Sequence, residues 1–390
     1  MWRKPKHVEF LWDVLVLAMT SFGGVQVHIA LFLKKLVKEK GYLTEDELFE
    51  IQALCSFLPG PTSTQMITAI GYKRGGANLA YVTLIAWISP AVFVMTLAAF
   101  GMTYLRNRDI IQFVTPVGIG LILQAGWIMA KKFLRSPTYI LIFLSTVAVG
   151  LYIQNPFIFP VLLLLGGLIS SLNFKDFPSQ NKHKMIIPWA NFHLFWGFAV
   201  FLAVLGHFTD YYPIRIFENF YRNGSLVFGG GQVLVPVLFT EFVEFKHLIR
   251  EDDFLTGMTL SQTLPGPVFA LTSYLGVLLM KDYGMLGALA GSVIGALGIF
   301  LPGTFLIFFV YRIWGQLKQY RFIRASLPGI QSVSVGLTIV AVYTFIHPMI
   351  LQANFIGFGI VIVTFLVAQM TKLPPIALFV IALFAGIIVS

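Results

Sequence analysis

The feature that most constrains this chain is an element of 40 residues that occurs twice. Residues 22–61 and 228–267 both open with Phe-Gly-Gly and close with Leu-Pro-Gly-Pro, and 14 of the 40 aligned positions are identical at a constant offset of 206 residues. Glycine and proline interrupt helices, yet both copies lie in apolar sequence. The repeat therefore predicts interrupted helices at membrane depth, an arrangement from which transporters build ion sites.

The composition is that of a polytopic membrane protein. Apolar residues make up 57% of the chain and charged residues only 11%, against about 25% charged residues in a soluble domain. Stretches without Asp, Glu, Lys or Arg, such as 79–105, 138–172 and 325–371, are long enough to form membrane helices. The formal charge of +10 is scattered over short loops, which fits the positive-inside rule and argues against a nucleic-acid partner. The single cysteine, Cys55, excludes an intrachain disulfide and is predicted to lie in the core.

The two copies divide the chain into two halves. A polar linker begins at Asn173, and the halves stay in step beyond the repeated element, because helix prolines recur at Pro90 and Pro302. We expect a first repeat over 1–172, a linker with an extra hydrophobic segment over 173–216, and a second repeat over 217–390.

The charges of the loops predict that the two repeats are inverted. Lys73 and Arg74 mark a positive loop in the first repeat, whereas the equivalent loop of the second repeat holds Lys281 and Asp282. The basic loop of the second repeat lies instead at 312–324, so the positive side has switched. The expected fold is an all-α polytopic membrane protein with two inverted-topology repeats, broken helices and about 11–13 transmembrane segments.

Two topologies remain open from the sequence. If each breaker segment crosses the membrane once, Lys34, Lys35, Lys38 and Lys40 lie outside, against the positive-inside rule. If the breaker segments are re-entrant and the hydrophobic segment 189–208 does not cross, those lysines move inside and the repeats remain inverted, but Arg3, Lys4 and Lys6 are expected outside.

The breaker motifs predict an anion site. Pro61 is well placed as the first residue of a half-helix that Gly60 caps, and Gly266 with Pro267 offers an equivalent end from the opposite direction. Unpaired N–H groups and the macrodipole make such ends attractive to anions. The residues predicted to bind substrate are Gly23, Gly24, Gln26, Gly60, Pro61, Thr62, Ser63, Thr64, Gly229, Gly230, Gly231, Gln232, Gly266 and Pro267.

This site is chemically unequal in the two repeats, because Val268, Phe269 and Ala270 stand where the first repeat has Thr62, Ser63 and Thr64. Glycine pairs in membrane helices are more often packing devices, but their duplication favours a functional reading. His28 is predicted to be a packing residue. Glu241 and the other acidic residues near the repeats are predicted to be solvated loop charges, so no buried carboxylate is expected to carry a proton.

Several motifs resemble the long, two-domain form of the chromate ion transporter family. They are Ser-Phe-Gly-Gly at 21–24, Gly-aromatic-Leu-Thr at 41–44, Leu-Pro-Gly-Pro-Thr-Ser-Thr-Gln at 58–65, Phe-Gly-Gly-Gly at 228–231 and Leu-Pro-Gly-Pro at 264–267. The resemblance implies export of chromate across the bacterial inner membrane, with resistance as the result and sulfate as a similar competitor. The chain departs from the family pattern at Val25, where proline is common, and at Tyr42 and Leu248, where tryptophan is common.

Rival functions are an anion channel, a transporter of sulfate or another oxyanion, a structural subunit and a membrane-embedded enzyme. An enzyme is disfavoured because the chain has no His-Glu-x-x-His, Walker A or catalytic triad pattern. We therefore expect no catalytic residue, no metal site and no cofactor. The partners are the oxyanion and the lipid bilayer, and a homodimer, like the coupling ion, is left open.

Overall fold

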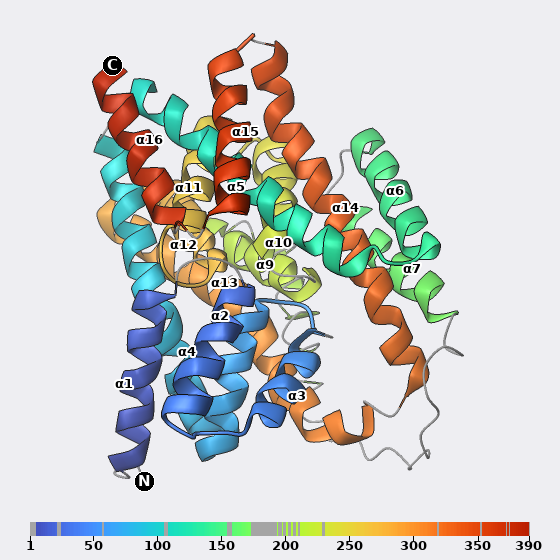
Figure 1. Ribbon diagram of the computed structural model, residues 1–390. Helices are drawn as coiled ribbons and strands as arrows, with labels where there is room; N and C mark the ends of the chain where they lie inside the picture. The colour runs from blue at the N-terminus through green and yellow to red at the C-terminus, as the bar shows by residue number, and fades with distance from the viewer. Residues whose placement is uncertain are drawn as a thin grey trace. The chain divides into compact units, whose positions relative to one another are not determined.

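The computed structural model describes residues 5–21, 25–56, 58–104, 108–153, 158–172, 211–227, 231–317, 320–351, 353–371 and 375–389, with Leu373 and a few single residues between 193 and 209 (Figure 1). Every regular element in these ranges is helical. Three helical segments in these ranges, Thr62–Met102, Val268–Trp314 and Arg324–Leu351, are long and apolar enough to cross a bilayer. The chain is therefore an all-α membrane protein.

The helices follow the same order in both repeats. The first repeat comprises α1 (Pro5–Thr20), α2 (Val25–Phe32), the π-helical η1 (Leu33–Glu39), α3 (Glu45–Ser56), α4 (Thr62–Tyr104), α5 (Arg108–Phe133), α6 (Pro137–Tyr152) and α7 (Ile158–Ser171). The second comprises α9 (Tyr212–Leu226), α10 (Gly231–Phe239), the π-helical η3 (Thr240–Phe245), α11 (Glu251–Thr263), the 3₁₀ turn η4 (Val268–Ala270), α12 (Leu271–Met280), the 3₁₀ turn η5 (Lys281–Tyr283), α13 (Gly284–Leu317), α14 (Arg321–Leu351), α15 (Phe355–Met370) and α16 (Pro375–Val389). The predicted interruptions after Thr20, Ser56 and Thr263 are confirmed. The extra hydrophobic segment expected near 189–208 lies almost entirely outside the described residues.

The backbone conformation is more similar between the two repeats than the amino-acid sequence is. Gly60 and Gly266, which are equivalent residues, have φ angles of 115° and 106°, and Gly76 and Gly284, at the next helix break, have 73° and 75°. Gly41 has φ 59°, and its equivalent is His247 with φ 50°. A residue with a side chain adopts this left-handed conformation only with strain. His247 nevertheless keeps it, so the two repeats share the course of the backbone even where the residue differs.

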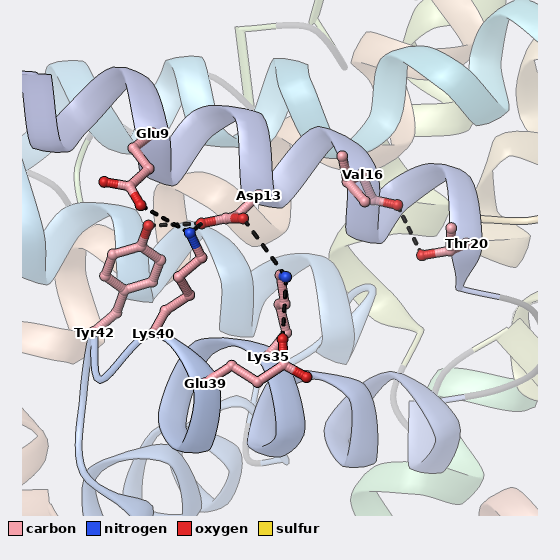
Figure 2. A network of polar contacts seen from close by, with 8 residues as sticks. All are labelled: Glu9, Asp13, Val16, Thr20, Lys35, Glu39, Lys40 and Tyr42. Carbon is pink, nitrogen blue, oxygen red and sulfur yellow. Dashed lines mark hydrogen bonds and ion pairs between the residues drawn. The ribbon is translucent and has the colours of Figure 1, made fainter.

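In the first repeat, α1 and the α2–η1 segment lie antiparallel, as the two arms of a hairpin that are joined between Ser21 and Val25. Near the open end of this hairpin, Lys40 Nζ lies 2.8 Å from Glu9 Oε1 and 3.4 Å from Asp13 Oδ2 (Figure 2). A second hairpin follows, in which α3 and the first part of α4 lie antiparallel. An ion pair between Glu47 and Lys73 closes its open end, and residues 58–61 lie at its tip.

These contacts favour the re-entrant topology for the first repeat. Each helical arm has 12 to 16 residues, which corresponds to roughly 18–24 Å, less than the ~30 Å hydrocarbon core. Both hairpins return to the side on which they start. Lys6, one turn before Glu9 on α1, therefore lies on the same side as Lys40 and Lys73. The expectation that Lys6 lies opposite these lysines is wrong: all three lie on one side, the pattern that the positive-inside rule favours.

A polar network ties the open end of the first hairpin together (Figure 2). Asp13 is only 5% exposed, and it accepts a hydrogen bond of 2.7 Å from the Tyr42 hydroxyl. Burial, followed by the bond to Asp13, raises the pKa of Tyr42. The hydrogen bond to Glu9 raises the pKa of Lys40. Tyr42 thus stays protonated and Lys40 charged well above neutral pH.

Among the described residues two carboxylates are buried, contrary to the expectation from the sequence. Asp13 is one; Glu241 is the other, since it is 1% exposed and lies 2.6 Å from Lys246 Nζ. The interpretation of Glu241 as a solvated loop charge is wrong because the π-helical turn of η3 brings Lys246 over it. Both carboxylates are neutralised by lysine, as expected for charges withdrawn from water.

We predict that Asp13→Asn destabilises the protein. Loss of the carboxylate leaves Lys35 and Lys40 facing each other without their shared counter-charge, which should cost about 2 kcal/mol and lower the midpoint of thermal unfolding in detergent by several degrees. Glu39→Gln is the matched control, because Glu39 forms an exposed pair with the same Lys35 and should change stability by only about 0.3 kcal/mol. An equal shift in both variants would contradict a structural role for Asp13.

Equivalent helices of the two repeats run antiparallel. The rings of Tyr81 on α4 and Phe308 on α13 have centroids 5.1 Å apart, and the hydroxyls of Thr96 on α4 and Ser292 on α13 are 2.6 Å apart. Residue numbers thus rise along α4 while they fall along α13. Since α4 and α13 occupy the same place in their repeats, this contact confirms the predicted inversion.

The helices gather into two compact units, each of which contains parts of both repeats. One unit comprises 1–97, 179–230 and 265–320, and the other comprises 98–178, 231–264 and 321–390. In the second unit α5 packs against α15 and α16, while its equivalent α14 packs against α6 and α7. Gly166 and Gly329 allow the backbones of α7 and α14 to approach closely, as small residues do in membrane helix packing.

Candidate functional site

The candidate site lies in the first unit, where each Pro-Gly-Pro tip meets a long helix of the other repeat. A β-carbon on Gly60 would lie 3.4 Å from the Gly303 Cα of α13, and one on Gly266 would lie 2.7 Å from the Ala91 Cβ of α4. Gly303 and Ala91 each follow the proline inside their helix, near its middle. The tips therefore reach the central part of the long helices.

A reciprocal pair of hydrogen bonds joins the two repeats at these tips. The Gly60 N–H donates to the Val227 carbonyl at 2.6 Å, and the Gly266 N–H donates to the Ser21 carbonyl at 2.8 Å. Val227 and Ser21 are equivalent residues, each directly before Phe-Gly-Gly. Each Pro-Gly-Pro tip is thus fixed to the other repeat's glycine segment by the same bond.

The amino-terminal turn of α4 presents unpaired donors. The first intrahelical bond runs from the Gln65 N–H to the Pro61 carbonyl at 2.9 Å, so the N–H groups of Thr62, Ser63 and Thr64 have no backbone partner within the described chain. These residues are 8%, 4% and 1% exposed. A helix start of this kind carries about half a positive charge and suits an anion.

The second tip offers fewer donors. It continues into the 3₁₀ turn η4, where the Ala270 N–H already donates to the Pro267 carbonyl at 2.9 Å. Val268, Phe269 and Ala270 are buried and carry no side-chain donor. The two tips therefore differ in the hydrogen-bond donors that they offer, as the sequence predicts.

Three side chains beside the first tip, those of Gln65, Trp87 and His28, are not among the residues predicted to bind substrate, and His28 is predicted only to pack. Gln65 Nε2 donates to the Pro59 carbonyl at 2.7 Å and to the Gly303 carbonyl at 3.4 Å, which holds the tip against α13. Trp87 Nε1 donates to Thr64 Oγ1 at 3.2 Å. His28 packs edge-on against Trp87, with ring centroids 5.3 Å apart. The available signal was a polar or aromatic residue within an apolar span: Gln65, Trp87 and His28 have Leu271, Ile299 and Leu234 as their repeat equivalents.

The structure brings together only part of the predicted set. Gly60, Pro61, Thr62, Ser63, Thr64, Gly266 and Pro267 lie at the two tips of the first unit. Gly23, Gly24, Gly229 and Gly230 lie outside the described residues, as do the side chains of Gln26 and Gln232. Gly231 begins α10, which belongs to the second unit.

The fold and these tips define a multi-pass membrane protein built from two inverted repeats with broken helices. The family model for the chromate transporter matches residues 8–171 and 214–387, so this chain belongs to the chromate transporter family. It is a family of transport proteins rather than of enzymes.

Relatives match either the whole chain or one repeat. An uncharacterised transporter of Methanocaldococcus jannaschii is 23% identical over 352 residues, which cover 87% of this chain and 85% of the relative. A chromate transport protein of Cupriavidus metallidurans is 23% identical over 346 residues, covering 83% of this chain and 78% of the relative. An uncharacterised transporter of Bacillus subtilis is 23% identical over 160 residues, covering 39% of this chain but 90% of the relative. No solved structure matches the chain significantly.

Proposed function

We propose that this protein exports chromate across the bacterial inner membrane by alternating access. The observation that carries the proposal is the turn at 62–64, where three N–H groups without a backbone partner among the described residues lie at a buried helix start in a chain of the chromate transporter family. The predicted residues at the tips, Gly60 to Thr64 with Gly266 and Pro267, form the proposed anion site. Gly23, Gly24, Gly229 and Gly230, with Gln26, are proposed to complete it.

Dipoles and neutral donors, rather than fixed cations, are proposed to hold the anion. Among the described residues, the hydrogen-bond partners of the tip residues are carbonyl, amide, indole and hydroxyl groups, and no Lys or Arg lies within residues 58–65 or 264–271. Such a site stabilises negative charge without a permanent ion pair that would slow release.

The direction of transport follows from charge. Lys6, Lys40 and Lys73 lie on one side of the membrane. Arg312 lies on the same side, because its Nε donates to the hydroxyl of Tyr72 at 3.0 Å. The positive-inside rule assigns this side to the cytoplasm. An anion leaving a cell with a negative interior gains about 2.3 kcal/mol per charge for each 100 mV. Membrane potential alone is therefore sufficient to drive export.

The inverted repeats supply the means of alternating access. Because each tip is held to the other repeat by an equivalent hydrogen bond, from Gly60 to Val227 and from Gly266 to Ser21, rocking of one repeat against the other is proposed to exchange the roles of the two tips. Transport of sulfate or another oxyanion by the same route is the alternative, as is an anion channel.

Uptake of radiolabelled chromate into inside-out vesicles tests the proposal. We expect saturable uptake, stimulated by an interior-positive potential, that exceeds uptake into vesicles without the protein. Sulfate, molybdate and phosphate added as competitors report substrate preference. Conductance without saturation in electrical recordings would identify a channel instead, and the absence of flux for every oxyanion would refute the proposal.

A further inference from the structure

An ion pair lies on α9, the helix of the first unit that leads to the first tip. Arg222 Nε lies 3.0 Å from Glu218 Oε1, and a terminal nitrogen of the same guanidinium donates to Asn219 Oδ1 at 3.2 Å. Val227, which directly follows α9, accepts the hydrogen bond from the Gly60 N–H. Arg222 precedes Val227 by five residues, which corresponds to about 7.5 Å of helix. Arg222 therefore branches from α9 about one and a half turns before the tip.

The neighbours of Arg222 along α9 show how deep the pair lies. A β-carbon on Gly298 would lie 2.6 Å from the Phe220 Cβ, and one on Gly224 would lie 2.6 Å from the Ile299 carbonyl oxygen. Gly298 and Ile299 are in the middle of α13, within a segment long and apolar enough to cross a bilayer. Ionised side chains at such a depth face a water-filled path or a binding site rather than lipid.

The pair belongs to a polar stripe, which consists of Arg215, Glu218, Arg222 and Ser225. Their spacing of three, four and three residues places them on one face of α9. Each of the four is at least partly exposed, and the side chains of Glu218 and Arg222 are 21% and 26% exposed. The polar stripe thus runs along α9 from its first turns to the residue two places before Val227.

The equivalent stripe of the first repeat is apolar after its first residue. Glu9, Trp12, Val16 and Met19 occupy the same positions on α1, and the last three are exposed, as side chains in contact with lipid are. The repeat therefore accepts an apolar stripe on this face, and its shape does not require the charges of α9. Because exposed ionised groups are costly in lipid, we infer that the polar stripe faces water.

The polar stripe starts at the outer side of the membrane. The ring of Tyr212, in the first turn of α9, stacks on the ring of Tyr283 with centroids 6.1 Å apart. Tyr283 lies directly before α13, at the end opposite to Arg312, and the positive-inside rule assigns the side of Arg312 to the cytoplasm. The polar stripe therefore leads from the outer side to the first tip.

We propose that Arg222 is an external anion subsite, which receives the oxyanion when it leaves the first tip towards the outer side. This inference rests on the proposed function and adds a second position to the path of the same anion. A planar guanidinium bonds well to two oxygens of an oxyanion, and Asn219 orients it through one nitrogen. The oxyanion replaces the Glu218 carboxylate at Arg222. When the oxyanion leaves, Glu218 pairs with the guanidinium again, so no unpaired charge remains at this depth.

Labelling of single cysteines tests whether the polar stripe faces water. Ser225→Cys and its repeat equivalent Met19→Cys are made in full-length Cys55→Ala protein, which has no other thiol. A membrane-impermeant anionic methanethiosulfonate is then added to the outside of spheroplasts. We expect Ser225→Cys to react at least about tenfold faster than Met19→Cys, because a thiol against lipid forms little thiolate. Equal rates, or no reaction at position 225, overturn the proposal.

A cationic methanethiosulfonate of similar size tests the charge of Arg222. Arg222 lies one turn from position 225 and Glu218 two turns, so Arg222 has the larger effect on the potential there. Arg222→Gln should lower the ratio of anionic to cationic labelling at Ser225→Cys by about threefold or more, and Glu218→Gln should raise it. An unchanged ratio in Arg222→Gln protein overturns the proposal. If that variant does not fold, as judged by size-exclusion chromatography, Arg222→Gln combined with Glu218→Gln, which leaves no unpaired charge, is measured against the same two outcomes.

Chromate is the probe for anion binding at Arg222. External chromate should slow the anionic labelling of Ser225→Cys, and Arg222→Gln should abolish this protection. Chromate flux in the vesicle assay without protection at position 225 overturns the subsite alone. Protection that depends on Arg222 without flux of any oxyanion supports the subsite and refutes the proposed function, because labelling does not require transport.

Discussion

Replacing Gly60 by leucine will abolish oxyanion transport while the protein remains folded. Gly60 has φ 115°, a conformation that strains any residue with a side chain. A β-carbon there would already lie 3.1 Å from Gln65 Nε2 and 3.4 Å from Gly303 Cα. A leucine side chain would therefore push the tip away from α13 and move the donors at 62–64. Because a displacement of about 1 Å can cost 100-fold in rate, uptake into vesicles should fall by at least roughly that factor.

The control must carry the same backbone strain without touching the tip. Gly41 has φ 59°, and a β-carbon there meets nothing within 4 Å, so Gly41→Leu reports the conformational penalty alone. We expect this variant to transport at a rate within about twofold of the unmodified protein, since a local penalty on the order of 1 kcal/mol lowers stability without moving the site. Comparable loss in both variants, or transport by Gly60→Leu at more than half the normal rate, would reject the tip as the anion site.

The positions of the helix breaks were predictable because they are local chemistry. Proline removes a donor and glycine permits positive φ, so Gly60 and Gly266 could be identified from the chain alone. The inversion was predictable as well, because the positive-inside rule acts on short loops such as Lys73-Arg74. Both features depend on residues that are close together in the sequence.

What the sequence left open depends on contacts between distant residues. The ion pair of Glu47 with Lys73 shows that the chain between these residues returns to the side on which it starts, and no local pattern predicts that pairing. The same holds for the bond from Gly60 to Val227, which joins the two repeats. Glu241 is a different case, because its partner Lys246 is only five residues away. The π-helical turn that brings them together was not recognised from the sequence.

Gln65 shows how a site residue escapes a motif search. It follows Thr-Ser-Thr directly, but its role depends on the carbonyl of Gly303, which is 238 residues away. A glutamine in an apolar span is a signal of function; the repeat comparison strengthens it, because the equivalent Leu271 shows that the fold does not require a polar residue there.

A disulfide will form between Thr96→Cys and Ser292→Cys, and none will form between Thr96→Cys and Phe308→Cys. The two hydroxyl oxygens at 96 and 292 are 2.6 Å apart, close to the ~2.05 Å of an S–S bond. Position 308 is the repeat equivalent of Thr96, yet its ring lies beside Tyr81, and the 16 residues from 292 to 308 span about 24 Å of helix. Both pairs are made in Cys55→Ala protein, which leaves no other thiol.

The two pairs distinguish the possible relations between the repeats. If the repeats were related by an axis along the membrane normal, residues 96 and 308 would lie at the same depth, and the second pair would be the one that crosslinks. Mass spectrometry of the oxidised, proteolysed protein detects the linked peptides in either case. Crosslinking at 96 and 308 would mean that α4 and α13 are parallel, and the two tips would then enter the membrane from the same side. A site reached equally from both sides requires opposed tips, so that result would remove the structural basis for alternating access in this chain.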